Sequence, residues 1–499
     1  MLISERTLAD DGEVVHPGDD GWDLARQAWN LAADQRPALV AFPESARDVA
    51  AVVDFARARG LRVAPQGTGH NAVAIASLED TVLLSTARMK GVEIDPAARR
   101  ARVQAGVVWL EVTAPASEHG LAPLAGSSQD VGVVGYTLGG GLSWLGRRHG
   151  LAANSVLAIE VVTADGRLRR VDADHDPDLF WALRGGGGSF GVVTAMEFAL
   201  YPAHELYAGA MFWPWERSAE VLHAWREWAA TAPDEVTASA RIMQMPPIPD
   251  VPEPLRGRAF VTIDGAFLGS EAAGAELLRP LRALGPEIDM FAAVPPVALS
   301  QIHGDPEAPV PYESVHHCLR ELPAEAVDAF VAAAGPDSGS TLLMAEIRHL
   351  GGALGRTAPG HGALGRLDAP YLLFGCGLLA GPESAAELDA QLPALGSALA
   401  PWHADRVYLN FEERPTDPGR IFDAETLRRL QAVKASVDPG DVLRSNHPIS
   451  PGSEARRAAR PQERSRSQSP SFSAASPILS PAFATPAPAS LNSARKRSE

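Results

Sequence analysis

Residues 61–86 read LRVAPQGTGHNAVAIASLEDTVLLST and contain the loop that decides between two nucleotide-binding folds. The segment 67–72 formally matches the GxGxxA fingerprint of Rossmann domains, and it follows a short predicted strand, LRVAP. In a Rossmann domain that fingerprint opens a long helix. Here residues 71–80 are too few for such a helix and run directly into a second predicted strand, TVLLST. The stretch therefore disfavours an NAD-dependent Rossmann dehydrogenase, which we keep only as an alternative.

Two further glycine-rich segments lie in the first 200 residues, at 126–141 (GSSQDVGVVGYTLGGG) and 185–191 (GGGGSFG). Glycine lets backbone amides approach a ligand closely, so such loops can hold a pyrophosphate without any lysine. The second segment precedes the β-branched strand VVTAMEF rather than a helix, and the chain has no GxxxxGK[ST] phosphate loop. Each loop alone could be a tight turn, but three together predict a bound nucleotide cofactor.

The elements around these loops are predicted from capping and periodicity. Ser45 and Gly60 bound a predicted helix over 46–59. Further strands are predicted at 100–106 and 190–200, and a hairpin at 156–173 whose Asp165-Gly166 turn would supply positive φ angles. Asp178 is expected to open a short helix, LFWALRG.

From residue 204 onward the pattern changes. Strands such as RAFVTIDGAFLG, TLLMAEIRHL and PYLLFGCGLL alternate with alanine-rich predicted helices such as SEAAGAELLRPLRALG and ESAAELDAQL, which is typical of an α+β domain with helices on one face of its sheet. The last segments before residue 450 are predicted as a strand, RVYLNF, and a helix, AETLRRLQAVKASV.

Composition narrows the class of protein. The 499 residues are 46% hydrophobic and 21% charged, as in an ordinary globular protein. The formal net charge of −17 repels phosphate backbones, so no nucleic-acid partner is expected. Two cysteines, Cys318 and Cys376, exclude a disulfide framework and suit a reducing compartment. The first residues lack the apolar core of a secretory signal, and residues 131–146 are too short and glycine-rich to span a membrane. We therefore expect a cytoplasmic protein without a membrane partner.

Five motifs occur in a fixed order: QGTGHN (66–71), GYTLGGGLSWLGRRHGLAANSV (135–156), DLFWALRGGGGSFGVVT (178–194), YLNF (408–411) and VDPGDVLRSNHPI (437–449). In this order they resemble the berberine bridge enzyme-like flavoproteins of the vanillyl-alcohol oxidase superfamily, over about nine tenths of the chain. The resemblance implies an α+β fold. A PCMH-type FAD-binding domain of two subdomains would accompany a central α+β substrate domain with an antiparallel sheet.

The resemblance also implies domain boundaries. An N-terminal segment, 1–35, would pack on the FAD-binding domain formed by 36–203. The substrate domain would span 204–401, and 402–450 would return to the FAD-binding domain. Residues 451–499 are rich in Ser, Pro, Ala and Arg without a period, which predicts a disordered tail.

By position, His70 resembles the histidine that is attached covalently to the 8α-methyl group of the flavin. A neutral imidazole is nucleophilic, and its small neighbours leave room for the flavin ring. The alternative role is a hydrogen bond to a phosphate. The other residues that the resemblance places at the cofactor are Gln66, Gly67, Thr68, Gly69, Asn71, Gly126, Ser127, Ser128, Val131, Gly132, Gly135, Tyr136, Gly141, Gly146, Asn154, Val192, Val193, Tyr408 and Asn410.

Two departures from the family pattern matter for chemistry. Many relatives hold the flavin by a second bond from a cysteine in a GxCxxVG stretch, where this chain has Ser128. A hydroxyl lacks thiolate nucleophilicity at neutral pH, and both cysteines are expected in the other domain, so FAD would be attached through His70 only. The catalytic tyrosine that ends the YxNY motif of many relatives is replaced by Phe411, which cannot accept a proton.

The base must then be another group. Relatives that use a glutamate after a Gly-Gly pair offer no match, because Arg356 occupies that position. We name Glu412, Glu413 and Tyr136 as candidate catalytic residues, with His349 and His361 as further candidates. Tyr408 and Asn410 are expected to share one face of a strand and to pack against the flavin edge.

His316 and His317 beside Cys318 could suggest a metal site, but adjacent side chains point apart, so no metal is expected. The resemblance implies an FAD-dependent oxidase or dehydrogenase. It would remove a hydride from a carbon bearing OH or NH in a small molecule, either a sugar or a secondary metabolite, with O2 reoxidising the flavin. The absent tyrosine keeps a second alternative open, a degenerate flavin-binding protein without turnover. Substrate and oligomeric state are left undetermined.

Overall fold

The computed structural model describes residues 13–75, 77–249 and 251–452. Its first unit is the predicted helix, α3 (Ala46–Arg59), which begins with a capping box: Ser45 and Asp48 exchange side chain-to-amide hydrogen bonds, and Gly60 ends the helix at φ +70°. The helix packs its buried valines on a four-stranded sheet in the order β1 (Glu13–Val15), β2 (Leu39–Phe42), β4 (Thr81–Ser85), β3 (Arg62–Gln66). Strands β2, β4 and β3 are parallel, and β1 is antiparallel to β2.

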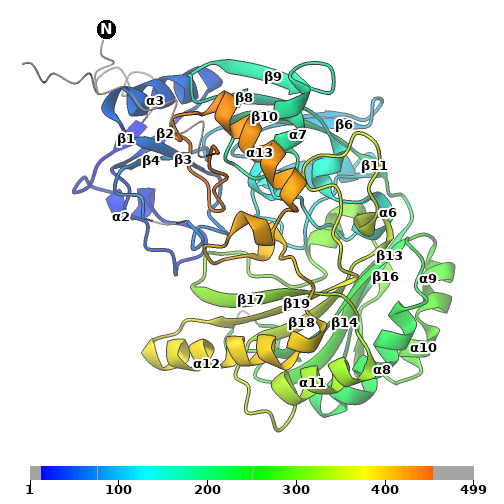
Figure 1. The fold of residues 1–499 in the computed structure, drawn as a ribbon. Coiled ribbons are helices and arrows are strands. Elements are labelled where there is room, and N and C mark those ends of the chain that lie inside the picture. Colours follow the sequence, from blue (N-terminus) through cyan, green and yellow to red (C-terminus); the bar gives the residue numbers. More distant parts are fainter. Residues whose placement is uncertain (1–12, 76, 250, 453–499) are drawn as a thin grey trace, which may run out of the picture. The chain divides into compact units, whose positions relative to one another are not determined.

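A second, antiparallel sheet has the order β5 (Val92–Asp95), β6 (Arg100–Gln104), β10 (Val192–Ala199), β8 (Val156–Val162), β9 (Leu168–Asp172). Four helices share its hydrophobic core: α4 (Leu110–Ser117), α5 (Val133–Leu138), α7 (Pro177–Leu183) and α13 (Ala424–Val437). The last of these comes from the far end of the sequence, and Figure 1 shows it in orange beside α7.

The third sheet is antiparallel and has eight strands. Its main order is β15 (Ile288–Asp289), β12 (Leu206–Pro214), β14 (Ala259–Leu268), β13 (Val236–Gln244), β18 (Met344–His349), β19 (Tyr371–Leu378), β17 (Tyr312–Leu319), and β16 (Ala292–Ala293) also pairs with β12. Helices α8 (Ser218–Ala229), α11 (Ala324–Ala334) and α12 (Pro382–Ala398) cover one face, as Figure 1 shows.

Alternation along the strands assigns opposite roles to the two faces of this sheet. Ala240 and Ile242 of β13 lie in the core under the helices. Arg241, between them, points to the other face, and on β18 the residues Glu346 and Arg348 do the same. The helices leave that second face open, so side chains from several strands can form the wall of a site.

Shorter elements complete the described chain: α2 (Trp22–Ala25), α6 (Gly146–His149), α9 (Glu271–Leu277), α10 (Arg279–Arg282), and the small sheet of β7 (Leu121–Ala122) with β11 (Tyr201–Pro202). The predicted α+β class and the antiparallel central sheet are confirmed. Apart from Pro451 and Gly452, the predicted tail lies outside the described residues.

Backbone hydrogen bonds fix the returning segment to the first sheet, and a buried lysine fixes it to the loop before β10. The amide of Val63 donates to Val442 O (2.9 Å), and the amide of Arg444 donates to Val63 O (2.8 Å). Lys434 is fully buried, and its Nζ donates to Asp438 Oδ2 (2.5 Å) and to Ser189 O (2.9 Å). The region after residue 402 therefore packs against the N-terminal half.

Four local predictions were wrong in detail. The single helix predicted over 270–285 is broken into α9 and α10, because Pro280 lacks the amide hydrogen that a continuous helix needs. The strand predicted over 406–411 does not form: the Tyr408 amide donates to His316 Nε2 (3.1 Å), and Leu409–Phe411 is a 3₁₀ turn.

In the 156–173 hairpin only Gly166 has a positive φ, +77°. Asp165 instead accepts hydrogen bonds from Thr163 and the Arg167 amide. Helix α7 begins at Pro177, one residue before the predicted Asp178.

Candidate active site

A cavity of about 1000 Å³ lies between the glycine-rich loops and the open face of the eight-stranded sheet. We call its two sides the loop wall and the sheet wall. The loop wall consists of residues 66–71, 126–128, 131–132, 134–136, 138–139, 187–188, 191 and 193. The sheet wall consists of Arg241, Met243, His303, Asp305, Tyr312, Met344, Arg348, Phe374, Cys376 and Leu378.

The first loop of the loop wall depends on Gly69. This residue has φ +85°, and a Cβ there would lie 2.9 Å from both Cα and Cβ of Ala28. Only glycine tolerates that backbone and that approach. Ala28 belongs to the N-terminal segment, which therefore packs directly against this loop. The next residue, Trp29, donates its amide to Thr68 O (2.9 Å).

His70 stands on this loop with one ring nitrogen available. Its Nδ1 lies 2.7 Å from Thr68 Oγ1, and its ring stacks on Trp29 with centroids 4.2 Å apart. Its buried Nε2 has no hydrogen-bond partner among the described residues, although Asp130 Oδ1 lies 3.5 Å away. An unpartnered buried nitrogen on a side chain that lines a cavity suits a group that binds or reacts with a ligand.

The second loop places Asp130 beside this histidine. Ser128 Oγ donates to Asp130 Oδ1 (2.9 Å), and Trp29 Nε1 donates to Asp130 Oδ2 (2.5 Å). Burial alone would raise the pKa of Asp130, but His70, Ser128 and Trp29 hold that pKa below its usual value. An ionised Asp130 therefore faces the imidazole.

The third loop contributes backbone. The Gly187 amide donates to Leu138 O (3.0 Å), which ties this loop to the end of α5. A Cβ on Gly191 would lie 2.2 Å from Val161 Cγ2, so the loop approaches β8 too closely for any side chain. The three loops thus contribute nine glycines to the lining of the cavity, at positions 67, 69, 126, 132, 135, 139, 187, 188 and 191.

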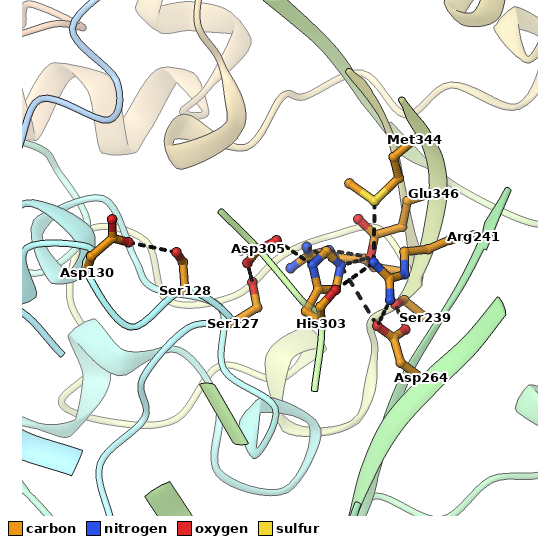
Figure 2. A network of polar contacts seen from close by, with 11 residues as sticks. Ser127, Ser128, Asp130, Ser239, Arg241, Asp264, His303, Asp305, Met344 and Glu346 are labelled. Carbon is orange, nitrogen blue, oxygen red and sulfur yellow. Dashed lines mark hydrogen bonds and ion pairs between the residues drawn. The ribbon is translucent and has the colours of Figure 1, made fainter. Parts of the chain in front are cut away.

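The sheet wall carries charged side chains, which Figure 2 shows as one network. The register of the strands brings these side chains together. Arg241 lies opposite Glu346 on the neighbouring strand, and Ser239 lies opposite Asp264 on one side and Arg348 on the other. The Arg241 guanidinium lies 2.7 Å from Asp264 Oδ2, and both side chains are almost fully buried.

His303 joins this network to the loop wall. Its Nδ1 lies 2.6 Å from Asp305 Oδ1 and its Nε2 3.3 Å from Glu346 Oε1. Ser127 Oγ of the second loop donates to Asp305 Oδ2 (2.7 Å), so Ser127, Asp305 and His303 form one hydrogen-bonded path between the two walls (Figure 2).

The charges of the network balance. Burial and Arg241 oppose protonation of His303, but Asp305 and Glu346 prevail and raise the pKa of His303 to about 9. Burial opposes ionisation of Glu346, yet Arg348, 2.8 Å away, and His303 lower its pKa to about 2. At neutral pH three cations therefore face three carboxylates, and neither His303 nor Glu346 is a competent base.

The rest of the sheet wall is apolar. Met243, Met344 and Cys376 form one buried cluster, against which Met245 and Phe374 pack. Burial raises the pKa of the Cys376 thiol far above its usual range and that of Cys318 to about 12. Both cysteines lie on the third sheet, Cys318 on β17 and Cys376 on β19, and Cys376 lines the cavity as a protonated thiol.

The YLNF residues lie where the two walls meet. Asn410 Nδ2 donates to Tyr136 O (2.9 Å) and to Tyr408 Oη (3.3 Å). The Phe411 ring lies between the Arg348 guanidinium, 5.1 Å away, and the Phe374 ring, 5.4 Å away. Aromatic and cation–π packing therefore occupies the position where relatives have a tyrosine hydroxyl.

The three candidate bases have different surroundings. Tyr136 lines the cavity with its ring, but its hydroxyl donates to Leu124 O (3.0 Å) and burial raises its pKa well above 10. Glu412 does not line the cavity, and its Oε1 accepts from the Arg414 amide (3.2 Å). Glu413 also lies behind the lining, but it accepts hydrogen bonds from Tyr312 and Ser314, and Tyr312 lines the cavity.

Several expected residues lie away from the cavity lining. Gly141 and Gly146 approach Tyr136 and Leu354, respectively. Asn154 binds the backbone of Gly362 and Gly365. Three more residues also lie outside the lining. Val192 is in the core between the first two sheets, and His349 contacts Arg147. The Nδ1 atom of His361 lies 2.9 Å from Gly365 O.

Within residues 13–75, 77–249 and 251–452, no three or more histidine, cysteine and acidic side chains gather in a way that could hold a metal ion. His316 accepts from the Tyr408 amide and His317 stacks on His403. Among the described helices, none is long and apolar enough to cross a lipid bilayer.

Sequence reasoning missed Trp29 and most of the sheet wall. Trp29 belongs to no glycine-rich motif, so nothing in its neighbourhood marked it. Arg348 carried a usable signal, because it stands two residues after Glu346 in the mainly apolar predicted strand TLLMAEIRHL, a pattern that marks a polar face. Arg241 lies in no strand that was predicted.

Comparison with known proteins agrees with this geometry. A model of the FAD binding domain family matches residues 37–172. The chain is 30% identical over 458 residues to (R)-6-hydroxynicotine oxidase of Paenarthrobacter nicotinovorans, an alignment covering 89% of this chain and 98% of that protein.

Solved structures share the fold. The crystal structure of 6-hydroxy-D-nicotine oxidase from Arthrobacter nicotinovorans matches with a TM-score of 0.76 and 28% identity, covering 88% of this chain and 98% of that one. Glucooligosaccharide oxidase from Acremonium strictum, described with a 6-S-cysteinyl, 8α-N1-histidyl FAD, matches in fold with a TM-score of 0.75 and 23% identity, covering 89% and 98%.

Proposed function

We propose a flavin linkage and a substrate class for this chain, which belongs to the berberine bridge enzyme-like family of FAD-linked oxidoreductases. The chain binds FAD and is an FAD-dependent oxidoreductase. When bound, FAD supplies the acceptor for a hydride. What this chain's own residues do is derived from the two walls of the cavity.

The loop wall fits the cofactor. Its glycines leave backbone amides accessible, and at Gly69 the backbone conformation itself excludes a side chain. Gln66, Gly67, Thr68, Gly69 and Asn71 would hold the diphosphate, with Gly132, Gly135 and Gly187 along the remaining backbone surface. No lysine lines the cavity, so this cradle would act through amide dipoles.

His70 is the residue for covalent attachment, through Nε2. His70 lines the cavity, its Nε2 has no hydrogen-bond partner among the described residues, and ionised Asp130 lies 3.5 Å from that nitrogen. Ser128, whose hydroxyl is engaged with Asp130, and the protonated Cys376 thiol would form no second bond. The flavin would thus be attached once.

The substrate is a small molecule with a mainly apolar body, oxidised at a carbon bearing OH or NH, with O2 as the final acceptor. The composition of the sheet wall supports this substrate class. Methionine, phenylalanine and leucine side chains surround a network in which each positive charge is paired with a carboxylate. An apolar body replaces ordered water at such a wall, whereas a sugar would leave hydroxyls unpaired there. The nicotine-oxidising relatives support the same class.

Anaerobic reduction of the bound flavin tests this proposal. Aryl carbinols, cyclic secondary amines and oligosaccharides are mixed with the holoprotein, and bleaching of the flavin absorbance is followed, then oxygen uptake. We expect an apolar carbinol or amine to bleach the flavin faster than any oligosaccharide.

A matched pair of variants sharpens the test. Met243→Gln on the sheet wall should weaken apparent affinity for the apolar substrate about tenfold, because a buried methionine contributes roughly 1.5–3 kcal/mol. Met290→Gln, at a site that is 60% exposed, should change nothing. Faster bleaching by oligosaccharides would overturn the substrate class, and no bleaching by any compound would favour a flavin-binding protein without turnover.

A further inference from the structure

Tyr312 connects the cavity to a carboxylate behind it. It is the first residue of β17 and lines the sheet wall, and its hydroxyl donates a hydrogen bond to Glu413 Oε1. The other carboxylate oxygen, Oε2, accepts from Ser314 Oγ (2.7 Å). Residues two apart on a strand point to the same side, so one strand presents both hydroxyls to the same carboxylate.

The backbone of Tyr312 is fixed from an unrelated part of the chain. Asn30 is fully buried, and its side chain both donates to Tyr312 O (3.2 Å) and accepts from the Tyr312 amide (3.4 Å). The two bonds together hold the strand end in one orientation. An asparagine used in this way restricts where the phenol can lie.

The same segment places Tyr312 close to the proposed site of flavin attachment. Trp29, the neighbour of Asn30, stacks on His70 with centroids 4.2 Å apart. The Tyr312 ring meets the edge of Trp29 with centroids 6.1 Å apart. His70, Trp29 and Tyr312 therefore follow one another along a single side of the cavity.

We propose that Tyr312 is a catalytic residue that accepts the substrate proton while it passes its own proton to Glu413, and so supplies the base that Phe411 cannot. This proposal rests on the proposed function, because it presumes a substrate that loses an O–H or N–H proton. Glu413 is a positioning and proton-accepting residue that acts through Tyr312.

The step balances in atoms and electrons. The substrate O–H or N–H bond breaks and its proton bonds to Tyr312 Oη, while the Tyr312 proton bonds to Glu413 Oε1. The electron pair left on the substrate oxygen or nitrogen forms the C=O or C=N bond as the hydride leaves carbon for the oxidant, FAD. Tyr312 ends neutral, and Glu413, which is partly exposed, can return its proton to solvent.

The electrostatics around Glu413 suit this task. Desolvation raises the pKa of Glu413 to about 7, against the lowering effect of the hydrogen bonds from Tyr312 and Ser314. The carboxylates of Glu412 and Glu313 also raise it. The other ionisable neighbours of this pair are Asp305 and the Cys376 thiol, and both raise the pKa of Tyr312 together with desolvation and Glu413. A base with its pKa near neutrality is the efficient choice at physiological pH.

Infrared difference spectroscopy of the holoprotein tests the carboxylate without any substrate. Between pH 5.5 and pH 8.5 we expect a carboxylic acid carbonyl band to disappear as Glu413 ionises. Glu413→Gln should remove that band, and the matched neighbour Glu412→Gln should retain it. A spectrum in which Glu413→Gln changes nothing would overturn the relay.

Kinetics test the phenol. The substrate is the panel member that bleaches the flavin fastest, and the rate of anaerobic flavin reduction is measured against pH. Tyr312→Phe should lower the rate about 10²–10⁴-fold with little change in apparent affinity, because a positioned base contributes that factor. Glu413→Gln should abolish the fall in rate below about pH 7, Glu413→Asp should partly restore it, and Ser314→Ala should keep it.

The outcomes separate the two proposals. If no compound bleaches the flavin, the proposed function fails and the infrared result still decides whether Glu413 titrates. If the wild type is reduced and Tyr312→Phe matches it in rate and pH profile with flavin content unchanged, the relay is wrong and the proposed function stands.

Discussion

The two walls of the cavity are built by opposite means. The loop wall uses short contiguous segments, 66–71, 126–139 and 187–193, and presents backbone. The sheet wall uses side chains on strands far apart in the sequence, such as Arg241 on β13 and Arg348 on β18. Arg241 donates to His303 O, and the His303 ring and Arg348 both contact Glu346. A cofactor common to a family can be held by backbone, whereas a particular substrate needs particular side chains. We therefore expect the residues that select the substrate to lie in the sheet wall.

Breaking the ion pair of the sheet wall should give the largest effect on stability. Asp264→Asn leaves the Arg241 guanidinium, 2.7 Å away and almost fully buried, without its partner. Removing one member of a buried pair costs about 3–5 kcal/mol. Urea denaturation of the holoprotein should show this loss.

The exposed pair Arg258 and Glu287 is the matched control, with the same 2.7 Å separation but each side chain about 40% exposed. Glu287→Gln should lower stability far less than Asp264→Asn, because water screens an exposed ion pair. Equal losses in Asp264→Asn and Glu287→Gln would contradict the view that the network is a buried structural unit.

A change that strains the backbone of the loop wall should weaken binding of the flavin. Gly69→Ala forces a side chain onto a residue at φ +85° and into Ala28, at a cost of about 1–3 kcal/mol. We expect flavin content to fall sharply, measured as the ratio of flavin to protein absorbance.

Gly355→Ala is the control, because this glycine lies away from the cavity lining, its nearest neighbour would be Leu367 O at 3.9 Å and its φ is ordinary. That variant should keep its flavin. Equal loss of flavin from both variants would show that the loss in Gly69→Ala does not come from strain at Gly69.

The smallest effect concerns pH. Burial and Arg241 oppose protonation of His303, but Asp305 and Glu346 raise its pKa to about 9, above the value of about 6.5 for an unfolded histidine. A raised pKa adds stability that is complete below pH 6.5 and is lost as pH rises through 9. The free energy of unfolding should therefore fall by up to about 2 kcal/mol between pH 7 and pH 9.5.

His303→Gln should remove that slope, and His223→Gln, on an exposed histidine of α8 paired with Asp328, should keep it. If the free energy of unfolding of His303→Gln still falls between pH 7 and pH 9.5, groups other than His303 cause the loss of stability.

The comparison of walls also explains what the sequence could predict. Helix α3 and the loop after β3 were predictable because their determinants are local: Ser45 and Gly60 bound the helix, and Gly69 follows a strand. The same locality made His70 recognisable. The sheet wall was not predictable in this way, since Arg241 meets Asp264 and Glu346 only through strand pairing.

The YLNF segment shows a different limit. Its alternating pattern indicated a strand, but tertiary contacts override it, because the Tyr408 amide donates to His316 and Asn410 reaches back to α5. Glu413 was named as a candidate base from its place beside this motif. Its connection to the cavity through Tyr312, 101 residues away, depends on the fold.

The most direct test of the account is peptide mapping of the denatured protein by mass spectrometry. The account predicts that the peptide containing His70 carries the mass of one FAD, that the peptides containing Ser128 and Cys376 carry none, and that His70→Ala releases all its flavin on denaturation. Flavin that leaves the unmutated protein on denaturation, or that is found on another residue, would contradict the assignment of His70 as the single point of attachment.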